Sequence, residues 1–170
     1  MSGSRIRRAA APDVPVLLDI YNHYVVHTHI TFDLQPLSLE QRLAWFGKFG
    51  DDGRYQCFVA EQDGRPIGWA CSGTFKERAA YDSSVETSVY LTPGVTGRGI
   101  GRRLYETLLE ALRGADVHRA YGGIAQPNDA SVRLHEAVGF AHIGTYREVG
   151  RKFGRFWDVA LYERPIERRP

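Results

Sequence analysis

A glycine-rich segment in the middle of the chain has the composition of an anion-binding loop. In "YLTPGVTGRGIGRRLYETLLEAL" (residues 90–112), glycine occupies alternate positions at Gly97, Gly99 and Gly101. Glycine has no Cβ, so a ligand can approach the backbone closely, and the first amides of the helix expected after the loop lack internal partners. Phosphate oxygens satisfy such amides and lie at the favourable end of the helix dipole. The spacing therefore indicates a phosphate site.

Arginine residues stand among these glycines and directly after them. Arg98, Arg102 and Arg103 lie where a helix start normally favours acidic residues, because its first amides carry partial positive charge. A bound anion would account for them, since guanidinium groups form charge-assisted hydrogen bonds with phosphate. The alternative is a glycine-rich turn surrounded by solvated arginines.

Two common nucleotide-binding motifs do not fit this loop. A P-loop needs Gly-Lys-Ser/Thr, and no such triplet occurs in the chain. A Rossmann fingerprint needs a glycine at position 102, where the chain has Arg102, and an acidic residue after the next strand, which the strand expected at "RAYGGIA" does not offer. The phosphates of another ligand are expected here.

Alternating strand-like and helix-like segments must position the loop. Strands are expected at about residues 6–10, 55–62, 65–75, 83–91, 119–125, 141–149 and 156–162, and helices at about 12–26, 38–50, 101–113 and 128–139. Asp63-Gly64 is a strong hairpin signal. In residues 83–91, Glu86, Ser88 and Tyr90 face one side of the sheet, and Val85, Thr87, Val89 and Leu91 face the other.

Capping residues define the expected helix ends. Asp13, Ser38 and Asn128 can cap helix starts, while Gly50 and Gly139 can end helices. The element order predicts an α/β (α+β) fold with a mixed, mostly antiparallel sheet and one strand–loop–helix–strand crossover in the middle. We expect one domain over residues 1–170, with its core at about 5–163 and a short basic tail.

The overall composition argues against several classes of protein. A net charge of +2 over 170 residues is too small to favour a nucleic-acid binder, and no apolar run approaches the length of a membrane span. The first residues lack the apolar stretch of a secretory signal. Cys57 and Cys71 are too few and too far apart for a metal site. We expect two reduced, buried thiols, no metal and a cytoplasmic location.

Five segments in register resemble one family. "IYNHYV", "TFDLQP", "KERAAYDSSVETSVYL", "PNDASVRLHEAVGF" and "GRKFGRFWDVALYE" are similar to the phosphinothricin and methionine sulfone/sulfoximine N-acetyltransferase branch of the GNAT superfamily, from about Ile6 to Glu163. The family's pyrophosphate loop reads Gln/Arg-x-x-Gly-x-Gly/Ala. Gly99 and Gly101 match it, whereas Thr96 departs at the first position. The resemblance implies about seven strands flanked by about four helices.

The resemblance also implies acetyl-CoA as the cosubstrate. It assigns the pantetheine arm to the backbone of the strand at 83–91 and the phosphates to the glycine loop, with one strand amide facing the thioester oxygen. The implied coenzyme contacts are Val89, Tyr90, Leu91, Gly97, Arg98, Gly99, Ile100, Gly101, Arg102 and Asn128.

Two titratable side chains match the family's catalytic positions. Glu86 corresponds to a glutamate near the amine and is our candidate general base, directly or through a water. His135 stands where many members have a tyrosine that protonates the thiolate, and an imidazole can donate or accept that proton. The alternatives are a glutamate on a solvated strand face and a helix-face histidine that packs or orients Glu86.

The segment "FKERAAYD" (residues 75–82) carries a polar cluster suited to an acidic acceptor, because arginine forks bind carboxylates and phosphinates. The resemblance implies acceptor contacts at Lys76, Glu77, Arg78 and Tyr81, and also at Phe32 and Lys152. A solvated charged loop is the alternative for the cluster. Ser83 replaces the tryptophan that phosphinothricin enzymes often carry at this point, which weakens the inference to phosphinothricin itself.

The leading hypothesis is a homodimeric N-acetyltransferase that moves acetyl directly from acetyl-CoA to the α-amine of a small amino acid analogue. Transfer of the acetyl group through a cysteine is not expected, because no sequence motif places a general base beside Cys57 or Cys71. The alternatives are another amine acceptor (an antibiotic, a polyamine or a protein N-terminus), a non-catalytic coenzyme A-binding regulatory module, and a nucleic-acid binder.

Overall fold

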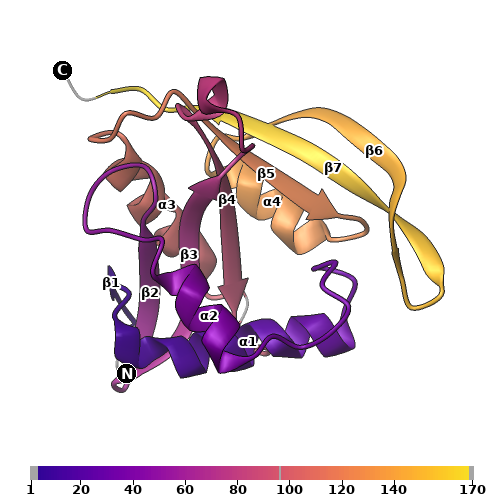
Figure 1. Cartoon of the computed structure of the whole chain (residues 1–170), viewed down its shortest axis with the longest axis horizontal. Coiled ribbons are helices and arrows are strands. Elements are labelled where there is room, and N and C mark those ends of the chain that lie inside the picture. The colour runs from indigo at the N-terminus through magenta and orange to yellow at the C-terminus, as the bar shows by residue number, and fades with distance from the viewer. Residues whose placement is uncertain (1–3, 96, 169–170) are drawn as a thin grey trace.

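The fold is described from a computed structural model, which covers residues 4–95 and 97–168. One sheet runs through the molecule in the strand order β1-β2-β3-β4-β5-β7-β6, and only the β4–β5 pair is parallel (Figure 1). The strands are β1 (Arg5–Arg8), β2 (Cys57–Gln62), β3 (Arg65–Thr74), β4 (Ser84–Leu91), β5 (Arg119–Ala125), β6 (Ala141–Lys152) and β7 (Arg155–Pro165). This mixed, mostly antiparallel sheet confirms the predicted fold class.

Helices cover both faces of the sheet. They are α1 (Val14–His27), α2 (Leu39–Phe46), α3 (Ile100–Leu112) and α4 (Asp129–Ala137), with short 3₁₀ turns at Ala11–Asp13 and Ala79–Tyr81. The larger hydrophobic cluster lies under α3 and α4, where Leu104, Leu108 and Leu112 are fully buried. A smaller cluster around Leu17 and Trp69 lies under α1 and α2.

Local sequence signals located most element boundaries correctly. Asp63 and Gly64 form the β2–β3 turn with φ of 51° and 77°, as a type I′ hairpin requires. Ser38 caps α2 in a capping box, and the Asn128 side chain caps α4 by accepting from the Ser131 amide at 3.2 Å. These interactions span only a few residues, so the sequence alone reveals them.

Other boundaries were wrong. The second helix ends at Phe46 rather than near Gly50, because Gly47 stops it and residues 48 and 49 continue as turns that bond to carbonyls three residues back. The last two strands are longer than expected and form one hairpin, which turns at Phe153-Gly154 with positive φ at both residues. This hairpin extends away from the body of the sheet (Figure 1).

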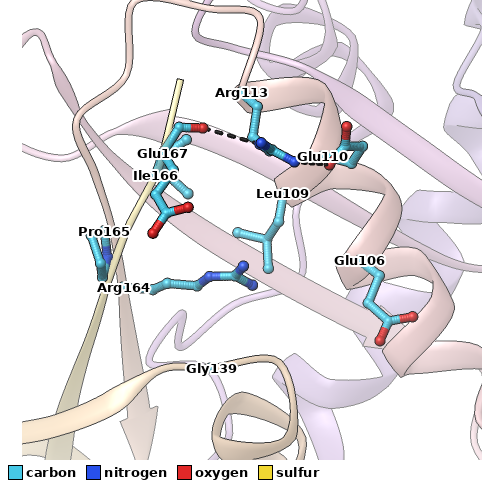
Figure 2. A pocket seen from close by; sticks show the side chains of 9 residues that line it. All are labelled: Glu106, Leu109, Glu110, Arg113, Gly139, Arg164, Pro165, Ile166 and Glu167. Atoms are coloured by element: carbon cyan, nitrogen blue, oxygen red, sulfur yellow. Dashed lines mark hydrogen bonds and ion pairs between the residues drawn. The ribbon is translucent and has the colours of Figure 1, made fainter. Parts of the chain in front are cut away.

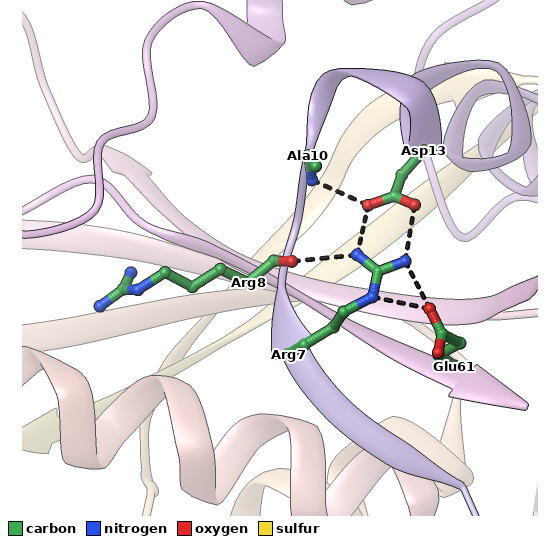
Figure 3. Close-up of polar contacts among 5 residues, drawn as sticks. All are labelled: Arg7, Arg8, Ala10, Asp13 and Glu61. Carbon is green, nitrogen blue, oxygen red and sulfur yellow. Dashed lines mark hydrogen bonds and ion pairs between the residues drawn. The ribbon is translucent and has the colours of Figure 1, made fainter. Parts of the chain in front are cut away.

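Asp13 does not cap α1 as predicted. Its carboxylate instead accepts two hydrogen bonds from the Arg7 guanidinium, at 2.7 and 2.9 Å, and one from the Ala10 amide at 2.8 Å (Figure 3). Arg7 also donates to Glu61 through Nε at 2.7 Å. Because bidentate arginine–carboxylate pairs are strong and directional, this cluster fixes β1, β2 and the start of α1 relative to one another.

Asp13 is only 6% exposed, yet its surroundings favour the ionised carboxylate. Burial by itself would raise its pKa, but the Arg7 guanidinium and the Ala10 amide overcome that effect and hold the pKa below its ordinary value. A lowered folded-state pKa means that the stabilisation is complete above the unfolded pKa and is lost as the pH falls.

We expect Asp13→Asn to lower the free energy of unfolding by about 2 kcal/mol at pH 7, because it removes hydrogen bonds between charged partners. Denaturant unfolding of both proteins checks this. The difference should shrink as the pH falls below about 4, because Asp13 of the unfolded wild-type protein takes up a proton there and the folded carboxyl does so at lower pH. A difference that is unchanged at pH 3 would contradict the assigned ion pair.

Candidate active site

The site begins where β4 and β5 separate. The two strands pair only from Ser84 to Glu86 on β4 and from Arg119 to Tyr121 on β5. Beyond this point β4 stays paired with β3 and β5 stays paired with β7. The Thr87 hydroxyl lies 3.1 Å from the Tyr121 carbonyl oxygen. A side-chain hydroxyl therefore stands where the next backbone hydrogen bond between the two strands would form. We call the opening beyond this point the fork.

A cleft of about 290 Å³ runs from the fork to the glycine loop. It is lined by nine of the ten predicted coenzyme contacts, which are Val89, Tyr90, Leu91, Gly97, Gly99, Ile100, Gly101, Arg102 and Asn128. The fork itself holds a smaller hollow, which shares Val89, Tyr90 and Asn128 with the cleft and also touches His135. The structure therefore brings together the residues that sequence reasoning assigned to the coenzyme.

The glycine loop has an open surface. Gly97 and Gly99 have φ of 84° and 72°, in the left-handed region that favours glycine, and a Cβ on either would meet no atom within 4 Å. The residue at the N-cap of α3 is Gly99, which has no side chain with which to cap the helix. The first amides of α3 are thus available to an anion.

The arginines take different positions around this loop. Arg102 lines the cleft and donates from Nε to Glu106 at 2.7 Å. Arg103 turns away to bond Ser4, so the expectation that it faces the anion was wrong. Arg98 is exposed and is not among the residues that line the cleft. Thr96, where the loop departs from the family pattern, lies outside the described residues.

Glu86 and His135 lie on opposite faces of the sheet. A Cβ on Gly122 of β5 would lie 2.7 Å from His135 Nε2, whereas one on the next residue, Gly123, would lie 3.8 Å from Glu86 Oε1. Successive strand residues point to opposite faces, so the fork separates the two groups. The idea that His135 orients Glu86 by contact is therefore wrong.

The Glu86 side chain is solvent-accessible within a concave surface. It lines a hollow of about 260 Å³ between α2 and the outer face of β3 and β4. Although the side chain reaches solvent, the walls of the hollow remove part of the water around its carboxylate, and this desolvation raises the pKa of Glu86 above its usual range. Ser88, two residues further along β4, lines both this hollow and the fork hollow, so the two spaces meet at that residue.

His135 is 4% exposed and belongs to a buried hydrogen-bond chain. Its Nδ1 lies 2.8 Å from the Ser131 carbonyl oxygen, and its Nε2 lies 3.0 Å from the Tyr105 hydroxyl. Tyr105 in turn lies 2.5 Å from the Thr87 hydroxyl at the base of the fork. His135 is thus connected through two side chains to the point where β4 and β5 part.

The partners of His135 fit a neutral ring in which the Thr87 hydroxyl donates to Tyr105 and Tyr105 donates onward. A carbonyl can only accept, so Nδ1–H donates to Ser131, and Nε2 of the neutral ring accepts from Tyr105. Burial lowers the pKa of His135, although the Ser131 carbonyl partly opposes this, and the neutral form is favoured. Tyr105 and Thr87 were missed as site residues. The available signal was a polar residue, Thr87, on the apolar face of an alternating strand.

The predicted acceptor cluster is an exposed loop between β3 and β4. Lys76 Nζ lies 5.1 Å from the ring centres of both Phe75 and Tyr81. Phe75 stacks on Tyr121 at 4.3 Å, and Tyr121 is the β5 residue directly opposite Glu86. The cluster therefore reaches the neighbourhood of Glu86 through two aromatic rings. Glu77 and Arg78 are exposed in the same loop.

Phe32 and Lys152 hold the α1–α2 loop against the β6–β7 hairpin. Lys152 is 4% exposed and donates from Nζ to the Thr31 carbonyl at 2.7 Å, while the Phe32 ring covers Gly150. Nearby, His29 stacks on Trp157 at 4.1 Å. This packing supports the wall of the cleft, to which the loop contributes Ile30.

The two cysteines are free and buried, as predicted. Cys57 and Cys71 stand directly opposite each other on β2 and β3. Burial raises the pKa of both thiols, and that of Cys71 to about 12, so neither is a thiolate at neutral pH.

A larger hollow, of about 480 Å³, lies away from the fork between α3 and the end of β7 (Figure 2). Its wall includes Arg113, which donates to Glu110 and to the Glu167 carbonyl. It contains neither the glycine loop nor Glu86. Among residues 4–95 and 97–168, no helix is long and apolar enough to cross a bilayer.

Known proteins match this chain over most of its length. A model of the Acetyltransferase (GNAT) family matches residues 17–140. A phosphinothricin N-acetyltransferase of Streptomyces coelicolor is 52% identical over 95% of this chain and 96% of its own length. An L-methionine sulfoximine/L-methionine sulfone acetyltransferase of Salmonella typhimurium is 33% identical over 95% of this chain and 94% of that protein.

A solved structure agrees with the fold. A GNAT superfamily phosphinothricin acetyltransferase from Sinorhizobium meliloti, in complex with acetyl-CoA, superimposes with a TM-score of 0.90 at 31% identity. The match covers 98% of this chain and 90% of that chain.

We expect Gly122→Ala to displace the His135 ring, because the new methyl would lie 2.7 Å from Nε2, and to cost about 1–3 kcal/mol of stability through overpacking. Gly144→Ala on β6 is the matched control, since its Cβ would meet nothing within 4 Å. Thermal unfolding and the NMR signals of His135 measure the outcome. Equal behaviour of the two variants would contradict the described placement of the ring.

Proposed function

Because the chain belongs to the GNAT acetyltransferase family, we propose that it transfers acetyl from acetyl-CoA to the α-amine of a small amino acid analogue. One observation carries the proposal: the fork hollow shares Val89 and Tyr90 with the cleft that ends at the glycine loop, and it shares Ser88 with the hollow that Glu86 lines. A donor in the cleft and an amine beside Glu86 would therefore face each other across β4.

The cleft suits the parts of acetyl-CoA. The start of α3, where the N-cap residue is a glycine, and the open surface of Gly97 and Gly99 fit a pyrophosphate, and Arg102 adds a cation. Beyond Glu86, the edge of β4 that faces the fork is free of β5 pairing. The pantetheine amides can align along Val89–Leu91 as an added strand, and a β4 amide can stabilise the thioester oxyanion.

We propose direct transfer, with Glu86 as the general base. Its raised pKa brings it closer to the pH at which proton removal from an ammonium is efficient, directly or through a water. The high pKa of both cysteines supports a route without an acyl-enzyme. We assign His135, which lies on the other face of the sheet, to protonating the departing thiolate of coenzyme A. Its neutral Nε2 must first take up a proton before it can donate one.

The names of the relatives support the acceptor class. The proteins of Streptomyces coelicolor and Salmonella typhimurium are named for phosphinothricin and for methionine sulfoximine or sulfone, which are all small α-amino acid analogues. We include Lys76, Glu77, Arg78 and Tyr81 as acceptor contacts on the β3–β4 loop. Phe32 and Lys152 are assigned to holding the α1–α2 loop, which contributes Ile30 to the walls of the cleft and the fork hollow.

Thiol release from acetyl-CoA with a panel of amines tests the acceptor class. We expect turnover with methionine sulfone, methionine sulfoximine or phosphinothricin, and little with spermidine or an aminoglycoside. Preference for spermidine or the aminoglycoside would replace the proposed acceptor class. Tight acetyl-CoA binding without turnover of any amine would instead support a regulatory module.

We expect Glu86→Gln to lower kcat about a hundredfold or more, because a positioned general base contributes roughly 10²–10⁴-fold. The dissociation constant for acetyl-CoA should hardly change. The wild-type rate should fall as the pH drops through the raised pKa of Glu86, since protonation removes the base. The pH–rate profile of the variant should not show this fall. Unchanged turnover would exclude Glu86 as the base.

We also propose a cytoplasmic homodimer. The β6–β7 hairpin exposes several large apolar side chains, Ile143, Tyr146, Val149, Phe153 and Phe156. Exposed apolar groups of this extent on one projecting element favour an interface. Sedimentation equilibrium decides between a dimer and a monomer.

A further inference from the structure

The two buried cysteines, which the proposed acetyl transfer does not use, form a close pair across the β2–β3 hairpin. Cys57 on β2 stands directly opposite Cys71 on β3. Both belong to the smaller hydrophobic cluster under α1 and α2, together with Leu17 and Trp69, so their side chains lie on the same face of the sheet. Two opposed thiols on one face are candidates for a covalent link.

The hydrogen bonds around the pair show how closely its side chains approach. The Cys57 carbonyl accepts from the Ala9 amide on the β1 side, and so points away from β3. The Ser72 amide donates to the Gln56 carbonyl at 3.0 Å, one residue beyond the pair on each strand. This is the pattern of a non-hydrogen-bonded pair, in which opposing Cα atoms are about 4.5 Å apart. Disulfides span Cα separations of roughly 4.4–6.8 Å, so the pair lies within their reach.

A buried positive charge acts on both thiols. Arg42 of α2 is 2% exposed, and its Nε and Nη2 have no hydrogen-bond partner within residues 4–95 and 97–168. Its guanidinium carbon lies 3.4 Å from the centre of the Trp45 ring and 4.6 Å from that of the Trp69 ring. Burial raises the pKa of both cysteines, and the Arg42 charge opposes this. Such a cation stabilises the thiolate, which is the form of cysteine that reacts with oxidants.

The hollow beside Glu86 gives access to one sulfur of the pair. Cys71 lines this space of about 260 Å³, whereas Cys57 is not among the residues that line it. At about 30 Å³ per water, the volume equals roughly nine waters, so a molecule as small as hydrogen peroxide can enter. Cys71 is therefore the sulfur that such an oxidant reaches first.

We propose that Cys57 and Cys71 are an oxidation site, in which hydrogen peroxide converts the two thiols into a disulfide between β2 and β3. The Cys71 thiolate attacks one peroxide oxygen and becomes a sulfenic acid, while the other oxygen leaves as hydroxide and is protonated to water. The Cys57 thiolate then displaces hydroxide from the Cys71 sulfur, which gives the disulfide and a second water. Overall, two thiols and one peroxide give one disulfide and two waters. This site is independent of the proposed acetyl transfer, and a thiol reductant reverses the link.

The groups around the pair set the pH at which it reacts. The titratable side chains that interact electrostatically with it are Asp13, Arg42, Glu86, Tyr90 and Tyr105. Burial outweighs the favourable Arg42 charge, so the thiolate is a small fraction at neutral pH and grows as the pH rises. We expect the rate of disulfide formation to rise about tenfold per pH unit from about pH 7 to 9, because only the thiolate reacts. A rate that does not change with pH would overturn this mechanism.

Thiol counting and peptide mass mapping test the link itself. After millimolar hydrogen peroxide at about pH 8, where more thiolate is present, we expect no free thiol and one linked peptide pair that contains Cys57 and Cys71. Dithiothreitol should restore both thiols. Two thiols that remain intact, or sulfinic and sulfonic acids without a linked pair, would overturn the proposal.

Single alanine variants test the order of the two steps, and each is the matched control of the other. In Cys57→Ala, Cys71 should form a sulfenic acid that dimedone traps, because this residue borders the hollow. In Cys71→Ala, Cys57 should remain a thiol over the same period. Equal trapping in the two variants would overturn the assignment of Cys71 as the first sulfur to react.

Arg42→Met tests the role of the buried charge, because methionine fills a similar space without a cation. A neighbouring opposite charge lowers a pKa by about one unit or more, so we expect oxidation of this variant to be about tenfold slower at the same pH. Arg65→Met is the matched control, since Arg65 is exposed at the start of β3. Equal oxidation rates in these two variants would overturn the role assigned to Arg42.

Thermal unfolding tests whether the link fits the folded hairpin. A disulfide that fits stabilises the protein by restricting the unfolded chain, so the Tm of oxidised wild-type protein should exceed that of the reduced protein by about 5 °C or more. Cys57→Ala treated in the same way should show no such rise. A lower Tm after oxidation would show that the link strains the strands, and would overturn the inference that the pair is placed to form it.

Discussion

The early separation of β4 from β5 is the constraint on which the rest of the site depends. Parallel strands gain hydrogen bonds along their whole length, but here pairing stops after Glu86 and Tyr121. Each strand keeps its other neighbour, so the sheet remains intact while one internal edge opens. The unpaired edge of β4 is a template for a ligand that offers amides and carbonyls in an extended line.

A buried polar chain maintains this opening. Thr87, Tyr105 and His135 connect the base of the fork to α4 by hydrogen bonds, and the Ser131 carbonyl ends the chain. Buried polar groups are costly when unpaired, so each member of the chain requires the next. The arrangement also accounts for Gly122, because any side chain there would occupy the place of the His135 ring. Packing, protonation state and the shape of the fork are therefore linked.

The two faces of the sheet carry different charged groups around the fork. Glu86, Lys48 and the shielded Arg42 belong to the side covered by α1 and α2, while the glycine loop and Arg102 begin α3, which packs on the other side. The sheet thus keeps the charges of the glycine loop apart from those around Glu86. Between them, the α1–α2 loop is fastened to the β6–β7 hairpin through Lys152 and His29, which ties the wall of the cleft to an element late in the chain.

The sequence by itself determined what depends on neighbouring residues. The glycine spacing located the loop, Asp63-Gly64 located the hairpin, and Ser38 and Asn128 located two helix starts, because each signal acts within a few residues. Resemblance across five motifs added the family and the residues that line the cleft. Only the tertiary structure decided that β4 and β5 part after Glu86, that Arg103 bonds Ser4, and that Lys48 borders the hollow of Glu86. These features join residues far apart in the chain, and their positions follow from packing that no local pattern records.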